Sequence, residues 1–144
     1  MAQTARITLE NGNTIDMTFY PADAPKTVEN FVTLAKKGYY NGLTFHRVVP
    51  DFVVQGGCPK GDGTGGPGYT IPAEFNSKKH LRGSVAMARS QHPDSAGSQF
   101  YICYGATPHL DRNYTVFGQV MSGMEHVDRI KQGDRMKTVE ILEA

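Results

Sequence analysis

The stretch FHRVVPDFVVQGG, residues 45–57, sets one arginine, one histidine and one glutamine among β-branched and aromatic residues and ends in two glycines. Such residues without helical spacing are typical of strands, so residues 43–55 are predicted to be β structure. A guanidinium is rarely buried without a partner, so Arg47 in this company is not expected to be ordinary surface charge. Either Arg47 pairs internally with an acid such as Asp51, or it lines a pocket that awaits a ligand.

Before this stretch, the sequence predicts a β-hairpin followed by a helix. Apolar and polar residues alternate over residues 5–9 and 15–19, on either side of an Asn-Gly pair whose two residues tolerate positive φ. Pro25 suits the first turn of a helix, and Gly38 supplies its C-terminal stop. Between them, four apolar residues have the spacing i, i+3, i+4 and i+7: Val28, Phe31, Val32 and Ala35.

After this stretch, the sequence alternates between loops and short strands. A loop dense in glycine and proline is expected over residues 58–69. Short strands are expected over three later segments, 84–88, 99–103 and 115–120. Ser122 and Glu125 have the spacing of a capping box, which predicts a second short helix ending near Gly133. A closing strand is predicted around residues 139–141.

These elements together predict a mainly β fold. Many short strands, two helices and no βαβ alternation are typical of an antiparallel barrel. A length of 144 residues is that of a single domain with one sizeable core. No linker composition or internal repeat divides residues 1–144, so one domain is expected.

The composition narrows the classes of partner. The net charge is +1 and no apolar run could span a bilayer, so neither nucleic acid nor a membrane is an expected partner. Residues 1–6 lack the pattern of a signal peptide, which makes cytoplasmic residence the expectation. Without a secretory signal, Cys58 and Cys103 are expected to be free thiols. Their apolar neighbours in the sequence are expected to raise the pKa of both thiols.

Three common chemistries find little support in the sequence. Gly61, Gly63 and Gly66 match the spacing G-x-G-x-x-G, but no helix pattern follows for a phosphate to bind, which favours a tight surface loop. The histidines form no H-x-x-x-H pair and neither cysteine has a C-x-x-C partner, so no metal and no cofactor are predicted. Ser98 lacks the surroundings of a nucleophile elbow.

What remains is Arg47 together with glutamines and apolar residues. Residues two apart on a strand point to one face, so Val53 and Gln55 share a face, as do Gln99 and Tyr101. Two such strands could line a shallow groove. Alternatively, the glutamines satisfy internal backbone groups and Arg47 meets an acid. Composition and spacing leave both interpretations open.

The sequence resembles the cyclophilins, the peptidyl-prolyl cis–trans isomerases, in its small bacterial-like single-domain form. Residues 45–57 are similar to the signature of that family, in which Phe-His-Arg precedes two apolar residues and a later Gln-Gly-Gly follows. Further blocks recur in the family's order: Gly63-Thr64-Gly65-Gly66, Met87-Ala88-Arg89, Gly97-Ser98-Gln99-Phe100, Leu110-Asp111 and Val116-Phe117-Gly118. The resemblance covers essentially the whole chain.

The resemblance implies a closed eight-stranded antiparallel β-barrel capped by two α-helices, with the site on its outer face. It implies that Arg47 is the catalytic arginine, with Gln55 and His46 beside it. The substrate-binding residues that it implies are Phe52, Val53, Gly63, Ala88, Arg89, Ser90, Gln99, Tyr101, His109, Leu110 and Tyr114. Among these, a segment of three is matched to the part that holds the residue before proline: Ala88, Arg89 and Ser90.

Three departures from the family pattern lie opposite the signature stretch. His109 stands where many members have tryptophan, Tyr114 where many have histidine, and Tyr101 where phenylalanine is commoner. Because the family's cyclic-peptide immunosuppressant uses that tryptophan, weakened cyclosporin-type binding is expected. The expected partners are proline-containing peptides and unfolded or partly folded proteins, and a monomer is expected. The alternative function is a proline-segment binding, scaffold or chaperone module with little turnover.

Overall fold

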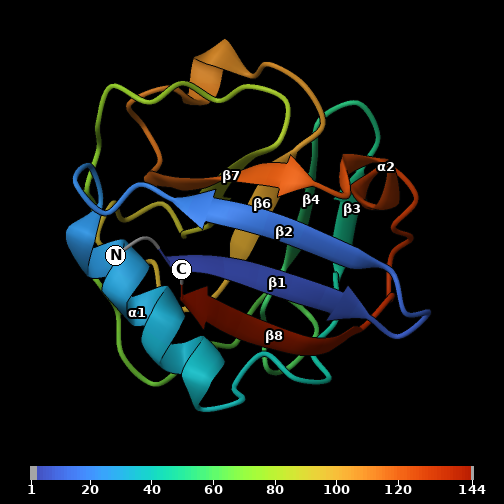
Figure 1. Ribbon diagram of the computed structural model, residues 1–144. Coiled ribbons are helices and arrows are strands. Elements are labelled where there is room, and N and C mark those ends of the chain that lie inside the picture. The colour runs from blue at the N-terminus through green and yellow to red at the C-terminus, as the bar shows by residue number, and fades with distance from the viewer. Residues whose placement is uncertain (1–2, 144) are drawn as a thin grey trace.

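The computed structural model describes residues 3–143, in which eight strands form one antiparallel sheet (Figure 1). The strands are β1 (Gln3–Leu9), β2 (Thr14–Phe19), β3 (Arg47–Val49), β4 (Val53–Gly56), β5 (Ser84–Met87), β6 (Phe100–Cys103), β7 (Val116–Ser122) and β8 (Met136–Glu143). Their order across the sheet is β3-β4-β6-β5-β7-β2-β1-β8. The helices are α1 (Pro25–Lys36), the 3-10 turn η1 (Pro108–Leu110) and α2 (Met124–Val127).

The sheet is an open half-barrel, so the predicted closed barrel is wrong. Its edge strands are β3 and β8, and they do not pair with each other. Irregular chain instead bridges the two edges: the Phe45 N–H donates to the Asp134 carbonyl (2.8 Å), and the Met136 N–H donates to the Leu43 carbonyl (2.8 Å). The mainly β, antiparallel architecture with two helices is confirmed.

The predicted N-terminal hairpin is present, with a wider turn than an Asn-Gly pair alone makes. Strands β1 and β2 pair from Thr4 opposite Thr18 to Thr8 opposite Thr14. The Leu9 N–H donates to the Asn13 carbonyl (2.8 Å), so the turn spans residues 10–13. Within it, only Gly12 has a positive φ (91°).

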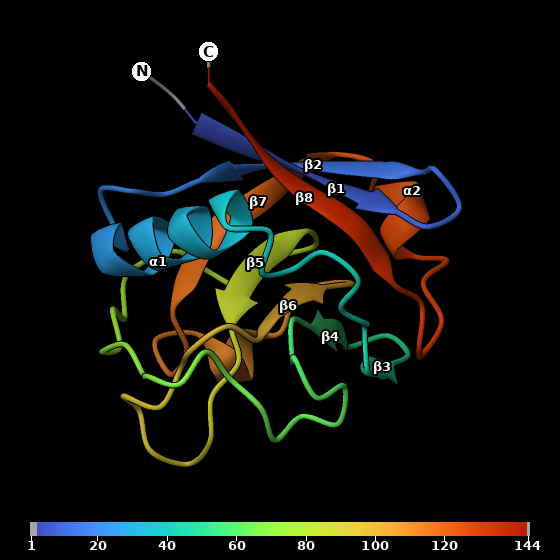
Figure 2. The ribbon, with the colours of Figure 1, turned by 90° about the horizontal axis from the view of Figure 1, so that it is seen from below.

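Helix α1 covers one end of the sheet and buries the predicted apolar stripe (Figure 2). Its N-cap residue, Ala24, has no side chain that could bind the first free N–H groups. Glu74 performs this function from a distant loop, because its carboxylate accepts hydrogen bonds from the N–H groups of Thr27 (2.7 Å) and Lys26 (3.2 Å). A negative charge at a helix N-terminus also interacts favourably with the positive end of the helix dipole.

The predicted capping box of the second helix is wrong. Ser122 is the last residue of β7, and its hydroxyl donates to Asp16 (3.3 Å) rather than to a helix N–H. The N-cap is Gly123, which has a φ of 88°. Only glycine fits there, since a Cβ would lie 2.3 Å from the Thr14 carbonyl oxygen. Helix α2 has a single turn, Met124–Val127, and so ends before the predicted end near Gly133.

Residues 43–55 contain two strands rather than one. Strands β3 and β4 form a hairpin in which Arg47 lies opposite Gln55 and Val49 opposite Val53. Asp51, in the connecting turn, has a φ of 61°. This hairpin forms one edge of the sheet (Figure 2).

The two sides of the sheet bury different clusters. The main core holds the apolar residues of α1 and an aromatic group formed by Phe19, Phe31, Tyr40, Phe100 and Phe117. A smaller cluster on β4, β5, β6 and β7 consists of Val53, Ala86, Tyr101, Cys103 and Val116. Half-buried Phe52, Leu110 and Tyr114 pack on this second cluster. It therefore has an accessible apolar margin.

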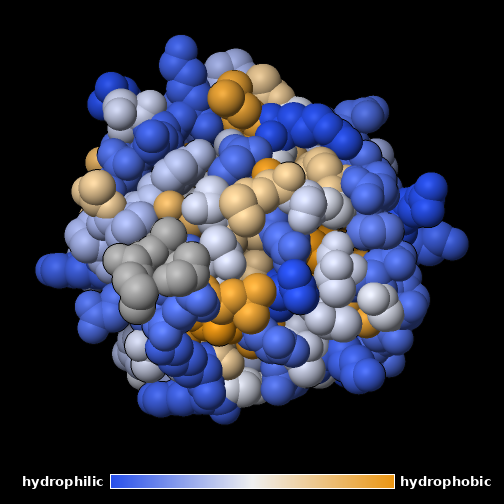
Figure 3. Space-filling model, in the orientation of Figure 1, coloured by the Kyte–Doolittle hydropathy of each residue, from blue (hydrophilic) through white to orange (hydrophobic). Residues whose placement is uncertain are grey.

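The surface carries apolar side chains mostly as scattered residues. In the face drawn in Figure 3, orange hydrophobic areas are small and separated by blue hydrophilic ones. The large apolar residues that are exposed are Tyr69, Phe75, Leu81 and Met121. No helix within residues 3–143 combines the length and the apolar character needed to cross a membrane.

Candidate active site

A cavity of about 400 Å³ opens over the smaller cluster. Its lining residues are His46, Arg47, Phe52, Val53, Gln55, Asp62, Gly63, Ala88, Arg89, Tyr101, Leu110 and Tyr114. Every predicted site residue lines this cavity except Ser90, Gln99 and His109. Asp62 lines it too, although nothing in the sequence singled it out.

The apolar part of the cavity is built from two paired strands and the turn η1. Val53 and Tyr101 are buried, on β4 and β6, while Phe52 and Leu110 remain half-exposed. His109 is exposed and stacks on Phe52, with ring centroids 5.7 Å apart. His109, predicted as a substrate-binding residue, therefore does not line the cavity itself but packs against a residue that does.

Arg47 is exposed and reaches the cavity from the first position of β3. Within residues 3–143 its guanidinium has no side-chain hydrogen bond and no ion pair, so the alternative in which it pairs with Asp51 is wrong. Gln55 is its cross-strand partner, and residues opposite each other on an antiparallel pair project to the same face. Arg47 thus has five free N–H donors, and the neighbouring Gln55 could orient its guanidinium.

The two predicted glutamines bind each other. The Gln55 Nε2 donates to the Gln99 Oε1 (2.9 Å), and the Gln99 Nε2 donates to the carbonyls of Gly63 and Gly65 (2.9 Å each). Gln99 therefore ties strand β4 to the glycine-rich loop. The Gln55 side-chain oxygen makes no hydrogen bond among the described residues, so it keeps its acceptor capacity.

His46 lies between Arg47 and the glycine-rich loop, where its surroundings favour the neutral ring. Burial lowers the pKa of His46; the Asp62 carboxylate opposes this, and the Arg47 charge adds to it. Its Nδ1 is buried without a hydrogen-bond partner among the described residues. His46 is consequently a neutral imidazole near neutral pH.

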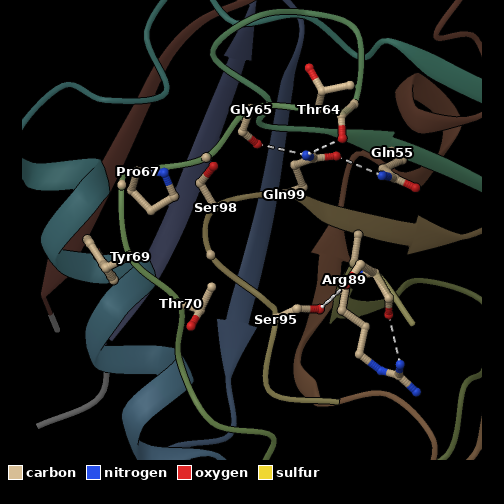
Figure 4. A pocket seen from close by; sticks show the side chains of 16 residues that line it. Gln55, Thr64, Gly65, Pro67, Tyr69, Thr70, Arg89, Ser95, Ser98 and Gln99 are labelled. Atoms are coloured by element: carbon tan, nitrogen blue, oxygen red, sulfur yellow. Dashed lines mark hydrogen bonds between the residues drawn. The ribbon is translucent and has the colours of Figure 1, made fainter. Parts of the chain in front are cut away.

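A second cavity of about 470 Å³ adjoins the first and shares four lining residues with it: Gln55, Gly63, Ala88 and Arg89. The segments 63–70, 88–90 and 95–99 enclose it (Figure 4). Ser90 and Gln99, which the first cavity lacks, line this one. Apart from His109, the predicted site residues thus line two adjoining cavities. The sequence did not predict that the glycine-rich loop after residue 63 would line a cavity.

Arg89 has its donors occupied by the protein. Its Nε and Nη2 donate to the Asn113 carbonyl (3.1 and 2.7 Å), and its Nη1 donates to the carbonyls of Ser90 (2.9 Å) and Gln91 (3.2 Å). Its guanidinium also lies 4.5 Å from the centroid of the Tyr114 ring, a cation–π geometry. Arg89 therefore joins its own loop to the segment 113–114.

The two cysteines are free thiols, as predicted, but their environments differ. Burial raises the pKa of Cys103 to about 11, which confirms the expectation for that residue. For Cys58 the expectation is wrong. Burial raises its pKa, but backbone hydrogen bonds from residues 60–65 outweigh this and lower it overall; the Gly65 N–H lies 3.2 Å from the Sγ.

The glycine-rich loop itself contains no helix, as predicted, and so has no helix N-terminus to face a phosphate. Within residues 3–143, no three His, Cys, Asp or Glu side chains gather as a metal site would require. The groups that line the two cavities are the Arg47 guanidinium, which has no partner within residues 3–143, together with amides, hydroxyls, the His46 ring, the Asp62 carboxylate, backbone groups and apolar side chains. Such a set suits a ligand that is a peptide.

Comparison with known proteins agrees with the sequence resemblance. Residues 4–144 match the family model described as "Cyclophilin type peptidyl-prolyl cis-trans isomerase/CLD". A peptidyl-prolyl cis-trans isomerase of Helicobacter pylori is 51% identical over 144 residues, which cover 96% of this chain and 88% of that protein. Peptidyl-prolyl cis-trans isomerase B of Bacillus subtilis is 50% identical over 141 residues, covering 96% of this chain and 98% of the relative.

The fold has similar solved structures. A crystal structure of a Cryptosporidium parvum cyclophilin-type peptidyl-prolyl cis-trans isomerase superposes with a TM-score of 0.91 at 29% identity, covering 100% of this chain and 99% of the other. A second crystal structure of that protein, obtained in the presence of the dipeptide Ala-Pro, gives a TM-score of 0.90 at 28% identity, covering 98% and 99%.

Proposed function

Because this chain belongs to the cyclophilin-type peptidyl-prolyl cis–trans isomerases, we propose that Arg47 stabilises the twisted X–Pro bond while the apolar cavity holds the proline ring. The activity is that of the family, isomerisation of peptidyl-prolyl bonds. The roles of individual residues are our proposal. The observation that carries it is the Arg47 guanidinium, which has no partner within residues 3–143 and lies in one cavity with the apolar side chains of Phe52, Val53 and Leu110.

The reaction needs a stabilised transition state and no covalent intermediate. Rotation about the peptide bond costs ~18–20 kcal/mol because amide resonance is lost, and uncatalysed exchange takes ~10–100 s. About 10³ turnovers per second would require roughly 7 kcal/mol less barrier. When the bond twists, the prolyl nitrogen becomes pyramidal and gains a lone pair. A donor fixed at that nitrogen interacts with the transition state and hardly with the planar ground state.

Arg47 has the properties that this donor needs. A guanidinium remains charged at physiological pH and presents a planar fork of donors. Arg47 is exposed and its guanidinium makes no hydrogen bond among residues 3–143, so binding a substrate would break none. The free acceptor of Gln55, directly opposite on β4, would hold the fork in place.

The proline ring would be gripped by the apolar wall of the first cavity. That wall consists of Phe52, Val53, Tyr101 and Leu110. Burying one medium-sized side chain in such surroundings contributes about 1.5–3 kcal/mol. This grip holds one side of the rotating bond, so that the other side can turn against it.

The peptide before the proline would extend toward the second cavity. Ala88 and Arg89 line both cavities and Ser90 lines the second, so this segment would hold the residue preceding proline. Gly63 also lines both cavities. The substrates are then proline-containing peptides and unfolded or partly folded proteins, processed by a single-domain monomer. Cyclosporin-type binding would be weakened, because His109 takes the place of the tryptophan.

The competing function is a module that binds proline segments with little turnover. Two-dimensional NMR exchange of an X-Pro peptide, at protein concentrations far below that of the peptide, separates the two functions. An isomerase produces exchange between the cis and trans signals that is absent from the peptide alone. Binding that shifts the peptide signals without accelerating exchange would show a recognition module and contradict the proposal.

A further inference from the structure

Behind the wall of the proline cavity lies a fully buried histidine, His80. Its ring Nδ1 is 2.9 Å from the Asp111 Oδ1, and its Nε2 is 2.8 Å from the Tyr101 hydroxyl. Its backbone N–H donates to the same Asp111 oxygen (2.7 Å), and its carbonyl accepts from the Thr107 N–H (3.0 Å). Every polar atom of His80 is therefore bound, and its side chain has no exposed surface.

The partners fix which nitrogen carries the proton. An ionised carboxylate only accepts hydrogen bonds, so Nδ1 must donate to Asp111. Burial lowers the pKa of His80, although the hydrogen bond and the charge of Asp111 oppose this, and the ring is accordingly neutral. In a neutral imidazole with its proton on Nδ1, Nε2 is an acceptor. The Tyr101 hydroxyl therefore donates to His80, away from the cavity.

His80 and its partners contact three residues that line the cavity: Tyr101 through a hydrogen bond, Leu110 through the turn η1, and Tyr114 through ring packing. Tyr101 is bound directly by His80. Asp111 directly follows Leu110 and closes the turn η1 through its N–H and the Pro108 carbonyl (3.1 Å). Tyr114 packs edge-on against the rings of both His80 (6.5 Å) and Tyr101 (5.9 Å).

We propose that His80, which does not line the cavity, is a positioning residue for isomerisation, because it holds the Tyr101 ring and the turn carrying Leu110 at the spacing that a proline ring requires. This inference deepens the proposed function and rests on it. By taking up the hydroxyl, His80 lets Tyr101 present only ring carbons to the substrate. Tyrosine here then serves as a phenylalanine anchored at its far end.

The alternative is that the network stabilises the fold without affecting the cavity. A double-mutant cycle separates the two possibilities. His80→Leu leaves the Tyr101 hydroxyl buried without a partner, which forces the ring to move or to admit water. We expect kcat/KM for an X-Pro peptide to fall about tenfold, mostly through KM, since residues in contact within one hydrogen-bond network are energetically coupled.

The same substitution is then made in a Tyr101→Phe background. Whatever activity Tyr101→Phe retains, adding His80→Leu should lower kcat/KM by a smaller factor than in the wild type, because the hydroxyl that His80 holds is already absent and only the hydrogen bond to Asp111 is lost. A factor as large as in the wild type would contradict the anchoring of Tyr101 by His80. If His80→Leu lowers the melting temperature in both backgrounds but leaves kcat/KM unchanged in each, the role is structural and the inference is wrong.

Two further measurements keep the test decisive. If His80→Leu alone fails to fold, the double variant and His80→Gln supply the comparison. The Gln amide can donate and accept, so His80→Gln should recover part of the activity.

NMR of the ¹⁵N-labelled ring should show a protonated Nδ1 and an unprotonated Nε2 at pH 7; the opposite tautomer would overturn the assignment. The wild-type protein is measured in every assay. If the wild-type protein does not accelerate exchange, the proposed function is wrong. If the wild-type protein is active and the His80 variants are equally active, only the inference about His80 is wrong.

Discussion

Arg47 and Arg89 line the same cavity, yet the surroundings of their guanidinium groups are opposite. Arg89 donates to the carbonyls of Asn113, Ser90 and Gln91 and lies over the Tyr114 ring. Arg47 is exposed and has no such partner among residues 3–143. The donors of Arg89 are bound to the protein, whereas those of the Arg47 guanidinium are free within the described residues.

The difference comes from the elements that carry the two side chains. Arg47 begins an edge strand, where its neighbours are β-branched residues and a glutamine whose amide N–H₂ already binds Gln99. Arg89 lies in the loop after β5, where residues 90–91 and residue 113 present carbonyl oxygens that accept from its guanidinium. Substitutions at the two positions should therefore have separable effects, on catalysis for Arg47 and on loop structure for Arg89.

The largest effect is expected for Arg47→Ala. Removing one donor aimed at developing charge typically costs about 10²–10³ in rate, so kcat/KM should fall by that factor in a coupled isomerase assay. Arg47→Lys should recover only part of the loss, because an ammonium is a point charge without the planar fork. Arg129→Ala is the matched control, since Arg129 is exposed and lines neither cavity. If Arg47→Ala kept the wild-type kcat/KM, the proposed difference in function between Arg47 and Arg89 would be wrong.

A smaller loss is expected for Gln55→Ala. This change removes the cross-strand neighbour of Arg47 and the hydrogen bond to Gln99, and loss of positioning should lower kcat/KM about tenfold. Gln119→Ala serves as the control, because the Gln119 amide binds the Arg82 carbonyl and lines neither cavity. Equal activities of the two variants would show that Gln55 does not orient the arginine.

For Arg89→Ala the expected effect is on stability more than on turnover. Its hydrogen bonds lie at the surface, so their loss should cost about 1 kcal/mol, which corresponds to a melting temperature lower by about 2–4 °C for a chain of this size. Differential scanning calorimetry measures this. The preference for the residue before proline should also change, which profiling of X-Pro peptides with varied X can detect. An unchanged melting temperature and an unchanged profile would mean that the contacts of Arg89 have no net value.

The smallest effect is expected from pH. Burial lowers the pKa of His46, so its ring is already neutral at pH 7 and stays neutral as the pH rises. A guanidinium does not titrate in this range. The value of kcat/KM should therefore be flat between pH 7 and 9. A bell-shaped profile would indicate a general acid or base with a pKa near 7 in place of a fixed donor.

Much of the fold follows from local patterns in the sequence. The alternation around the Asn-Gly pair predicted the β1–β2 hairpin, and the apolar stripe predicted α1, because each pattern reports on a face that must be buried. What failed depends on contacts far along the chain. Ser122 was taken for a capping residue, but it extends β7 and binds Asp16, 106 positions away.

Whether the sheet closes is likewise beyond the reach of local patterns. The prediction of a closed barrel required β3 and β8 to pair, but irregular chain at residues 42–45 occupies the edge of β8 instead. Cys58 is a similar case. Its neighbours in the sequence are apolar, whereas the groups that determine its pKa are N–H groups of a loop that folds back on it.

The candidate site was predictable mainly through the family resemblance. Residue spacing alone left Arg47 as either a paired charge or a pocket residue, since nothing local distinguishes an arginine with partners from one without. The network of Asp111, His80 and Tyr101 gave no signal in the sequence, because its members lie 21 and 31 positions apart and each looks ordinary by itself. Only their arrangement in space joins them.

The most direct test of this account is NMR exchange of one X-Pro peptide, measured in parallel with wild-type protein, Arg47→Ala and Arg89→Ala at equal concentrations. We predict that the exchange rate of the peptide with Arg89→Ala stays within a few-fold of wild type, and that with Arg47→Ala it falls close to the uncatalysed rate while the peptide still binds. Exchange with Arg47→Ala that stays close to the wild-type rate would contradict the assignment of Arg47 as the donor.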